Sequence, residues 1–194
     1  MSKSDPAASK RERNKTIRWV VTIFIVTIFI SGAISLLSDV IMENSSVFVA
    51  FLILLAIILI GIIFDIIGMA VASADEKPFH SMAARKVPGA QESIALLRNA
   101  ERVSSICNDV VGDICGVVSG SASATIAAQI LRNFEFTWPQ VISLLMSALA
   151  AGLTVGGKAI GKSFAVNSST AIVHSVGKCI HWLHSLTKPK KKTK

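Results

Sequence analysis

The sequence predicts an all-α membrane protein with about four transmembrane helices and amphipathic helices beside the membrane. Three observations lead to this class. Hydrophobic residues make up 52% of the 194 residues, and the mean hydropathy is +0.60, which is more apolar than an ordinary soluble domain. The apolar residues gather in four long blocks, and the basic residues gather between them. A helix rises about 1.5 Å per residue, so each block is long enough to cross a hydrocarbon core of about 30 Å.

The first half of the chain predicts two membrane spans behind a polar arm. Residues 1–16 are polar and basic, and we expect a disordered cytoplasmic arm. The first span is predicted over 17–38. An acidic turn with Asp39 and Glu43 follows, and the second span is predicted over 46–73. Because the second span is rich in Ile, Leu and Phe, we expect much of its surface to face lipid.

Two later segments are amphipathic rather than continuously apolar. Residues 75–102 contain Pro78 and Pro88 and mix apolar with basic residues, which predicts one or two helices along the inner membrane surface. Residues 168–186 are predicted to form a final amphipathic helix. The lysine-rich tail, residues 187–194, is expected to lie against anionic lipid head groups.

The third and fourth spans, predicted over 103–131 and 139–165, are rich in small residues. Glycines recur at four-residue spacing in both, at Gly112, Gly116 and Gly120 and again at Gly152 and Gly156. Small residues at this spacing let helix backbones approach closely in lipid. We therefore expect these two spans to form the packed interior and the first two spans to lie at the periphery.

The basic residues alternate with the apolar blocks in a way that predicts orientation. Of the 20 Lys and Arg residues, all but Arg132 fall in residues 1–18, 74–102 or 158–194. Basic loops stay on the cytoplasmic side, so we predict a multi-pass protein of the cell membrane with both termini in the cytoplasm. The net charge of +8 is divided among separate segments, whereas a nucleic-acid binder gathers its charge on one face. The sequence therefore predicts no nucleic-acid partner.

Two short motifs have ordinary explanations. Residues 156–163 read G-G-K-A-I-G-K-S, which matches the phosphate-loop pattern, but that loop requires a preceding strand. Here an apolar helical run precedes it, so we interpret the glycines as helix-packing residues. His174, His181 and His184 are interpreted as interfacial histidines rather than metal ligands. No nucleophile–base pair stands out, so we predict that the protein is not an enzyme and has no resident cofactor.

Ionisable residues within the spans are the strongest functional signal, because charge in a membrane is costly and usually faces a bundle interior. Asp65, Asp109 and Asp113 are predicted at similar depths, Asn108 adds an amide oxygen, and Lys158 lies at the same level. Carboxylate and amide oxygens suit Mg²⁺. The first hypothesis is therefore a metal site of Asp65, Asn108, Asp109 and Asp113. The alternative is an ion pair of Lys158 with Asp109 or Asp113 that locks the bundle.

The segment from about residue 60 to 186 resembles the transmembrane domain of the CNNM/CorC magnesium-transporter family. Residues 96–102 read L-L-R-N-A-E-R, similar to the family's L-L-x-N-P-E-R segment, and Asn108 falls near the family's helix-2 asparagines. Residues 157–165 read G-K-A-I-G-K-S-F-A, which resembles the signature G-E-V-x-P-K-S-x-A. Lys158 stands at the signature glutamate, and the 194 residues contain no segment resembling the family's paired CBS domains.

The resemblance implies a division of the chain and two functional hypotheses. Residues 17–38 form an extra span, and residues 46–186 form the domain similar to the family's. The first hypothesis is transport or binding of magnesium or cobalt ions, with a homodimer implied by analogy. The alternative is a non-transporting membrane scaffold or regulator with a degenerate ion site, in which Lys158 occupies the position of the cation.

Overall fold

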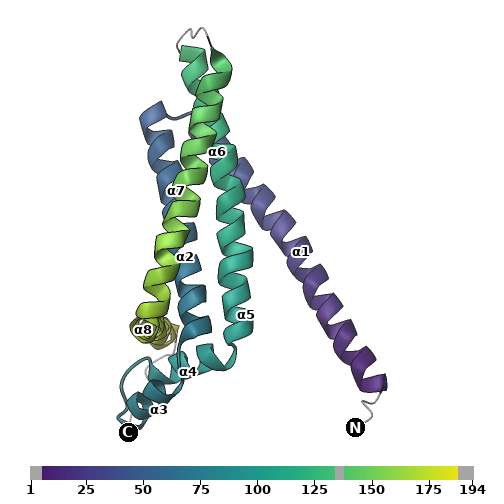
Figure 1. Ribbon diagram of the computed structural model, residues 1–194, viewed down its shortest axis with the longest axis vertical. Helices are drawn as coiled ribbons and strands as arrows, with labels where there is room; N and C mark the ends of the chain where they lie inside the picture. The colour runs from purple at the N-terminus through teal and green to yellow at the C-terminus, as the bar shows by residue number, and fades with distance from the viewer. Residues whose placement is uncertain (1–5, 134–137, 188–194) are drawn as a thin grey trace.

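The computed structural model describes residues 6–133 and 138–187, and every regular element in them is helical (Figure 1). Four helical stretches are long and apolar enough to cross a membrane. They are Ile17–Met42, Val47–Ser73, Ala100–Asn133 and Pro139–Asn167. The prediction of an all-α membrane protein with four spans is confirmed.

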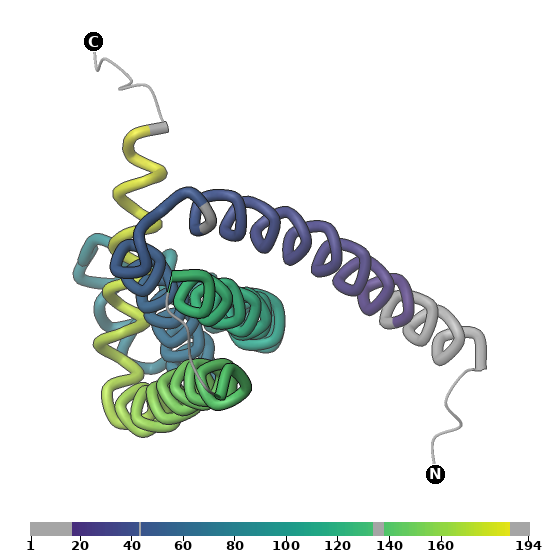
Figure 2. The backbone as a smooth tube through the Cα atoms, turned by 90° about the horizontal axis from the view of Figure 1, so that it is seen from above, coloured from purple at the N-terminus to yellow at the C-terminus, as the bar shows by residue number. Residues whose placement is uncertain are grey.

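The first helix, α1 (Pro6–Glu43), is longer than expected at both ends. Residues 6–16, expected to be a disordered arm, continue the helix, and residues 1–5 lie outside the described part. Asp39, expected in a turn, belongs to the helix. Figures 1 and 2 show α1 diverging from the other helices toward its N-terminus. In this diverging part of α1, Trp19 contacts α5, since the guanidinium carbon of Arg102 lies 5.9 Å from the centroid of the Trp19 ring.

The second helix, α2 (Val47–Ser73), begins at the cap residue Ser46, whose hydroxyl accepts a hydrogen bond from the backbone nitrogen of Val49. It contacts every other long helix of the bundle, so the prediction that α2 is peripheral is wrong. A buried stripe runs along one face of α2 at helical spacing. The stripe comprises Ala50, Leu54, Ile58, Gly61, Asp65 and Gly68.

Glycines allow these close contacts, but of the glycines at four-residue spacing only Gly112 is among them. A Cβ atom added to Gly61 would lie 2.8 Å from the Cβ of Cys115, and one added to Gly161 would lie 2.8 Å from Ile66. Four glycines of the spacing pattern have no atom within 4 Å of an added Cβ, and they are Gly116, Gly120, Gly152 and Gly156. The third span is the most buried of the four, as expected, but the fourth span is mostly exposed, so the expectation that it lies in the interior is wrong.

The third span changes its helical pitch where it meets α2. It consists of α5 (Ala100–Ser105), the π-helix η1 (Ile106–Gly112) and α6 (Asp113–Asn133). A π-helical turn inserts an extra residue per turn and rotates everything that follows, and such turns are frequent at functional sites. The sequence predicted a continuous helix here but not the π segment.

The fourth span, α7 (Pro139–Asn167), begins at Pro139 as predicted and contains the G-G-K-A-I-G-K-S segment. This segment is helical, so it forms no phosphate loop. The chain then turns at Ser168 into α8 (Ser169–Thr187). Figure 1 shows α8 end-on beside the upright bundle, and Figure 2 shows it lengthwise, so α8 lies across the bundle axis.

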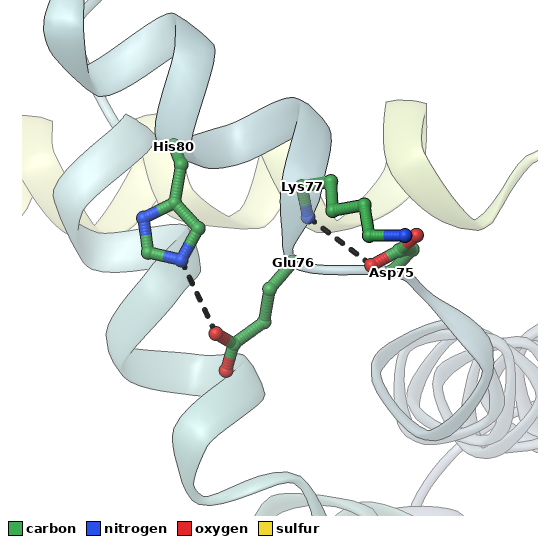
Figure 3. Close-up of polar contacts among 4 residues, drawn as sticks. All are labelled: Asp75, Glu76, Lys77 and His80. Carbon is green, nitrogen blue, oxygen red and sulfur yellow. Dashed lines mark hydrogen bonds and ion pairs between the residues drawn. The ribbon is translucent and has the colours of Figure 1, made fainter.

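Two short helices, α3 (Lys77–Ala84) and α4 (Ala90–Arg98), share this end of the bundle with α8, and we call it the capped end. The turn into α3 is fixed by side chains (Figure 3). Asp75 accepts a hydrogen bond from the backbone nitrogen of Lys77 at 3.1 Å, and Glu76 pairs with His80 at 3.3 Å. The amphipathic helices predicted over 75–102 and 168–186 are present.

Two apolar clusters hold the bundle together. The cluster away from the capped end comprises Met42, Ala50, Leu54, Ile58, Ala122, Ile126 and Ala150. The cluster at the capped end comprises Ala70, Val71, Phe79, Leu97, Ala165 and Val173. Along α2, Asp65 lies between the two clusters, so the main polar site has apolar packing on both sides.

Candidate intramembrane ion site

An ion pair between a buried carboxylate and a part-buried ammonium group joins α2 to α7. Asp65 is 4% exposed, and its Oδ1 atom lies 3.8 Å from the Nζ atom of Lys158. The same ammonium group donates a hydrogen bond of 3.3 Å to the backbone carbonyl of Gly112. Lys158 therefore connects α7 to both α2 and η1. A charge taken out of water needs a partner of this kind, because the desolvation of an ion costs several kcal/mol.

Glycines make room for this ion pair. A Cβ atom added to Gly112 would lie 3.3 Å from the Nζ of Lys158 and 3.5 Å from the Oδ1 of Asp65. Gly61 and Gly68 stand four residues before and three residues after Asp65, so they fall on the same face of α2. The absence of side chains at these positions lets the backbones approach, and the polar atoms become buried.

Two oxygen atoms of this region remain without hydrogen-bond partners. They are Oδ2 of Asp65 and Oδ1 of Asn108, and both are buried. The amide nitrogen of Asn108 donates to the hydroxyl of Ser104 at 3.3 Å, while its carboxamide packs against Gly68. A buried acceptor without a donor costs about 1–3 kcal/mol. Both oxygens are therefore suited to receive a proton, a water molecule or a hard cation.

The other two predicted ligands lie apart from this pair. Asp113 is exposed on α6, and Asp109 is exposed on η1, where it accepts a hydrogen bond of 2.8 Å from Ser105. Lys158 pairs with Asp65 rather than with either of them. Within the described residues, no three His, Cys, Asp or Glu side chains are grouped as a metal site. The depth estimate assumed an ordinary helical pitch through residues 106–112, where the structure has a π-helix.

Asp109 instead lines an open groove of about 510 Å³ at the capped end. The groove presents two carboxylates and two hydroxyls, and its lining residues are Ala72, Ala100, Glu101, Ser104, Ser105 and Asp109. Ser104 belongs to the groove and also accepts the hydrogen bond from Asn108. An acidic surface therefore leads from the capped end to the amide of Asn108.

Some polar residues of the bundle were not singled out by the sequence patterns. Gly112 contributes its carbonyl, which no side-chain pattern reveals. Asp39 meets two hydroxyls of α6, those of Ser121 and Thr125. The spacing of these hydroxyls at i and i+4 in an apolar helix was the available signal, but their partner was expected in a turn.

One histidine of α8 pairs with a carboxylate of α4. His181 Nδ1 lies 2.8 Å from the Oε1 atom of Glu92, and this hydrogen bond lowers the pKa of Glu92 below 4.5. Ser93, also on α4, donates hydrogen bonds to the carbonyls of Gly89 and Val173. The pairing fixes α8 to α4, which is a structural role.

Comparison with known proteins leaves the site to be interpreted from its own geometry. A scan against protein-family models, a search of curated proteins and a search of solved structures found no match. The resemblance to the CNNM/CorC family therefore enters the next section as part of a proposal.

Proposed function

We propose that this chain is a divalent-cation transport protein of the cell membrane, with Mg²⁺ as the cation, whose ion site is held closed by its own Lys158. The observation that carries the proposal is the buried contact of 3.8 Å between Lys158 and Asp65. The distribution of basic residues supports cytoplasmic termini. In that orientation the capped end and its acidic groove face the cytoplasm, and the lysine-rich tail meets anionic lipids there.

The charges explain how the lysine closes the site. One carboxylate and one ammonium group sum to zero, so the pair is neutral within the membrane. A Mg²⁺ ion at Asp65 would be repelled by an ammonium group within 4 Å of the same carboxylate. If the ammonium group leaves, the ion meets Asp65, the free Oδ1 of Asn108 and the carbonyl of Gly112. These are the hard oxygen ligands that Mg²⁺ prefers.

The acidic groove supports access to this site. Glu101 and Asp109 place two carboxylates beside the hydroxyls of Ser104 and Ser105. A groove of one charge sign raises the local concentration of counter-ions. Cations attracted there are next to Ser104, which is hydrogen-bonded to Asn108. The groove is therefore the proposed entrance from the cytoplasm.

The test replaces the lysine and measures ion binding and transport separately. Lys158→Met removes the ammonium group, and Lys158→Glu restores the carboxylate of the family signature. We expect Mg²⁺ to raise the thermal stability of both variants and to change the native protein little. A cation at about 100 times its Kd stabilises a folded state by about 2.7 kcal/mol. Lys162→Met is the matched control, because Lys162 is exposed on the same helix.

Two results would overturn the closed-site proposal. One is strong stabilisation of the native protein by millimolar Mg²⁺ that Lys158→Glu abolishes. The other is the absence of a Mg²⁺ response in both Lys158 variants, which would mean that Asp65 and Asn108 hold no cation after the ammonium group is removed.

A second candidate function is a membrane scaffold or regulator that transports nothing. The neutral, closed pair favours it, because such a pair can fasten α2 to α7 permanently. Uptake of Mg²⁺ into liposomes distinguishes the two functions. Transport by Lys158→Met supports the first, whereas binding without uptake supports the scaffold. A homodimer, implied by the family resemblance, is compatible with both.

A further inference from the structure

A second polar site lies between α1 and α6, away from the capped end. Asp39, one helical turn before the end of α1, accepts hydrogen bonds from two hydroxyls of α6. Ser121 donates to both carboxylate oxygens at 3.3 Å, and Thr125 donates to Oδ1 at 3.1 Å. The contacts are part-buried. They fasten the one helix that the family resemblance does not include.

Gln129 continues the same polar face by one further turn of α6. Its amide nitrogen donates to the carbonyl of Met42, three residues beyond Asp39 on α1. Gln129 is 6% exposed, and its Oε1 atom is buried with no hydrogen-bond partner. Its amide nitrogen is bonded to α1, so this oxygen lies at the α1–α6 contact. The contact therefore contains a buried acceptor that no described donor satisfies, and a hydrogen-bond donor or a cation would remove the cost of leaving it unpaired.

The negative charge of Asp39 is also uncompensated. Among the side chains that the structure describes, no lysine, arginine or histidine forms an ion pair with it. The last turn of α1 contains no basic residue, and the C-terminal end of a helix carries a partial negative charge. Carboxylate and helix end therefore reinforce one another at a place where charge is costly. Asp65 differs, because Lys158 compensates it.

From these observations we infer that the α1–α6 contact binds one small hard monovalent cation, for which Na⁺ is the probe. The ligands are the carboxylate of Asp39, the hydroxyls of Ser121 and Thr125, and the Oε1 atom of Gln129. Rotation of each hydroxyl turns a lone pair toward the ion in place of the proton now donated to Asp39. The bound ion joins α1 to α6 and so stabilises the position of α1.

The charge of the site selects a monovalent ion. One carboxylate is neutralised by one positive charge, whereas a divalent ion would leave a net charge of +1 among apolar helices. Mg²⁺ also requires near-octahedral geometry and retains several waters, which a contact between two packed helices does not accommodate. This inference is independent of the Mg²⁺ site, because no residue is shared between the two.

The experiment measures Na⁺ binding to the purified full-length protein at constant pH and ionic strength. Choline replaces Na⁺, thermal stability is followed, and the line width of the ²³Na resonance reports binding directly. We expect saturable stabilisation of the native protein by Na⁺. Asp39→Asn should abolish the response. Thr125→Val keeps the side-chain shape and should raise the apparent Kd for Na⁺ by about tenfold. Thr22→Val is the control, because the hydroxyl of Thr22 donates to the carbonyl of Arg18 on its own helix.

Three outcomes would overturn the inference. The first is a native protein whose stability and ²³Na line width do not depend on Na⁺. The second is an undiminished Na⁺ response in Thr125→Val, a variant that remains informative if Asp39→Asn fails to fold. The third is stabilisation by Mg²⁺ or by protons in choline buffer that equals the effect of Na⁺, which would make Asp39 a divalent-ion or protonation site.

Discussion

Two regions of the bundle each hold a carboxylate among apolar helices, but they compensate its charge differently. Near the capped end, Asp65 lies against the ammonium group of Lys158 and is almost fully buried. Farther from the capped end, the side-chain hydrogen bonds that Asp39 accepts within the described part of the chain come from the hydroxyls of Ser121 and Thr125. The first site is electrically closed, and the second retains a negative charge.

The helices around the two sites also differ in how closely they pack. Around Asp65, the helices α2, η1 and α7 approach through Gly61, Gly112 and Gly161. The helix α1 meets the bundle chiefly along α6 and diverges from it toward the N-terminus (Figure 1). Close packing from several sides requires a charge to be neutralised within the protein. At the α1–α6 contact, no described lysine, arginine or histidine forms an ion pair with Asp39.

The largest expected effect comes from breaking the neutral pair. Asp65→Leu leaves the ammonium group of Lys158 buried without its partner, and such losses cost about 3–5 kcal/mol. Adding Lys158→Met to Asp65→Leu should recover most of that loss, because an apolar pair of similar size is often as stable. Asp39→Leu should cost less, about 1–3 kcal/mol, because it removes hydrogen bonds from neutral hydroxyls. The free energy of unfolding in detergent is measured for the native protein and for these three variants.

The ranking of these variants tests the comparison itself. Equal losses for Asp65→Leu and Asp39→Leu, together with no recovery in the double variant, would mean that Lys158 does not compensate Asp65. The two carboxylates would then be equivalent, and the distinction between a closed and an open site would fail.

A smaller effect is expected from glycines on the two kinds of surface. Gly68→Ala places a methyl group against the carboxamide of Asn108, and overpacking of this kind costs about 1–3 kcal/mol. Gly120→Ala meets open space and should be neutral or stabilising by up to about 1 kcal/mol, because alanine favours the helix. Thermal unfolding of the two variants checks the order. A larger loss for Gly120→Ala would show that α6, and not α2, provides the packing surface.

The smallest expected effect concerns the capped end and depends on pH. The hydrogen bond from His181 lowers the pKa of Glu92 below 4.5, so Glu92 binds a proton more weakly in the folded protein than in the unfolded chain. The resulting stabilisation is complete above pH 4.5 and is lost as the pH falls through the lower pKa of the folded state. Pairs near the surface contribute about 0.2–1 kcal/mol.

Glu92→Gln should remove this part of the pH dependence, and melting temperatures between pH 6 and pH 3 would detect it. Asp65 and Asp39 are unchanged in the variant, so it separates the capped end from both intramembrane carboxylates. An identical pH profile for the native protein and Glu92→Gln would contradict the assignment.

The sequence alone determined the class of protein and the main boundaries. Apolar blocks of membrane-crossing length appear as four long helices. Ser46 and Pro139 mark helix starts because their backbone and side-chain chemistry act locally. The amphipathic segments at the capped end were predicted for the same reason, since helical periodicity is a property of neighbouring residues. Asp65, Asn108 and Lys158 were also identified, because ionisable or polar residues in an apolar span stand out without any tertiary information.

The tertiary structure decided which helix is central and which charges meet. Periodicity shows which residues share a face of a helix, but it does not show which helix that face contacts. The glycines at four-residue spacing were therefore assigned to the interior, whereas four of those five face open space and Gly61 and Gly68 on α2 make close contacts. The π-helix at residues 106–112 was not predicted, and Lys158 pairs with Asp65 rather than with Asp109 or Asp113. These outcomes depend on contacts between residues far apart in the chain, and local sequence patterns do not predict such contacts.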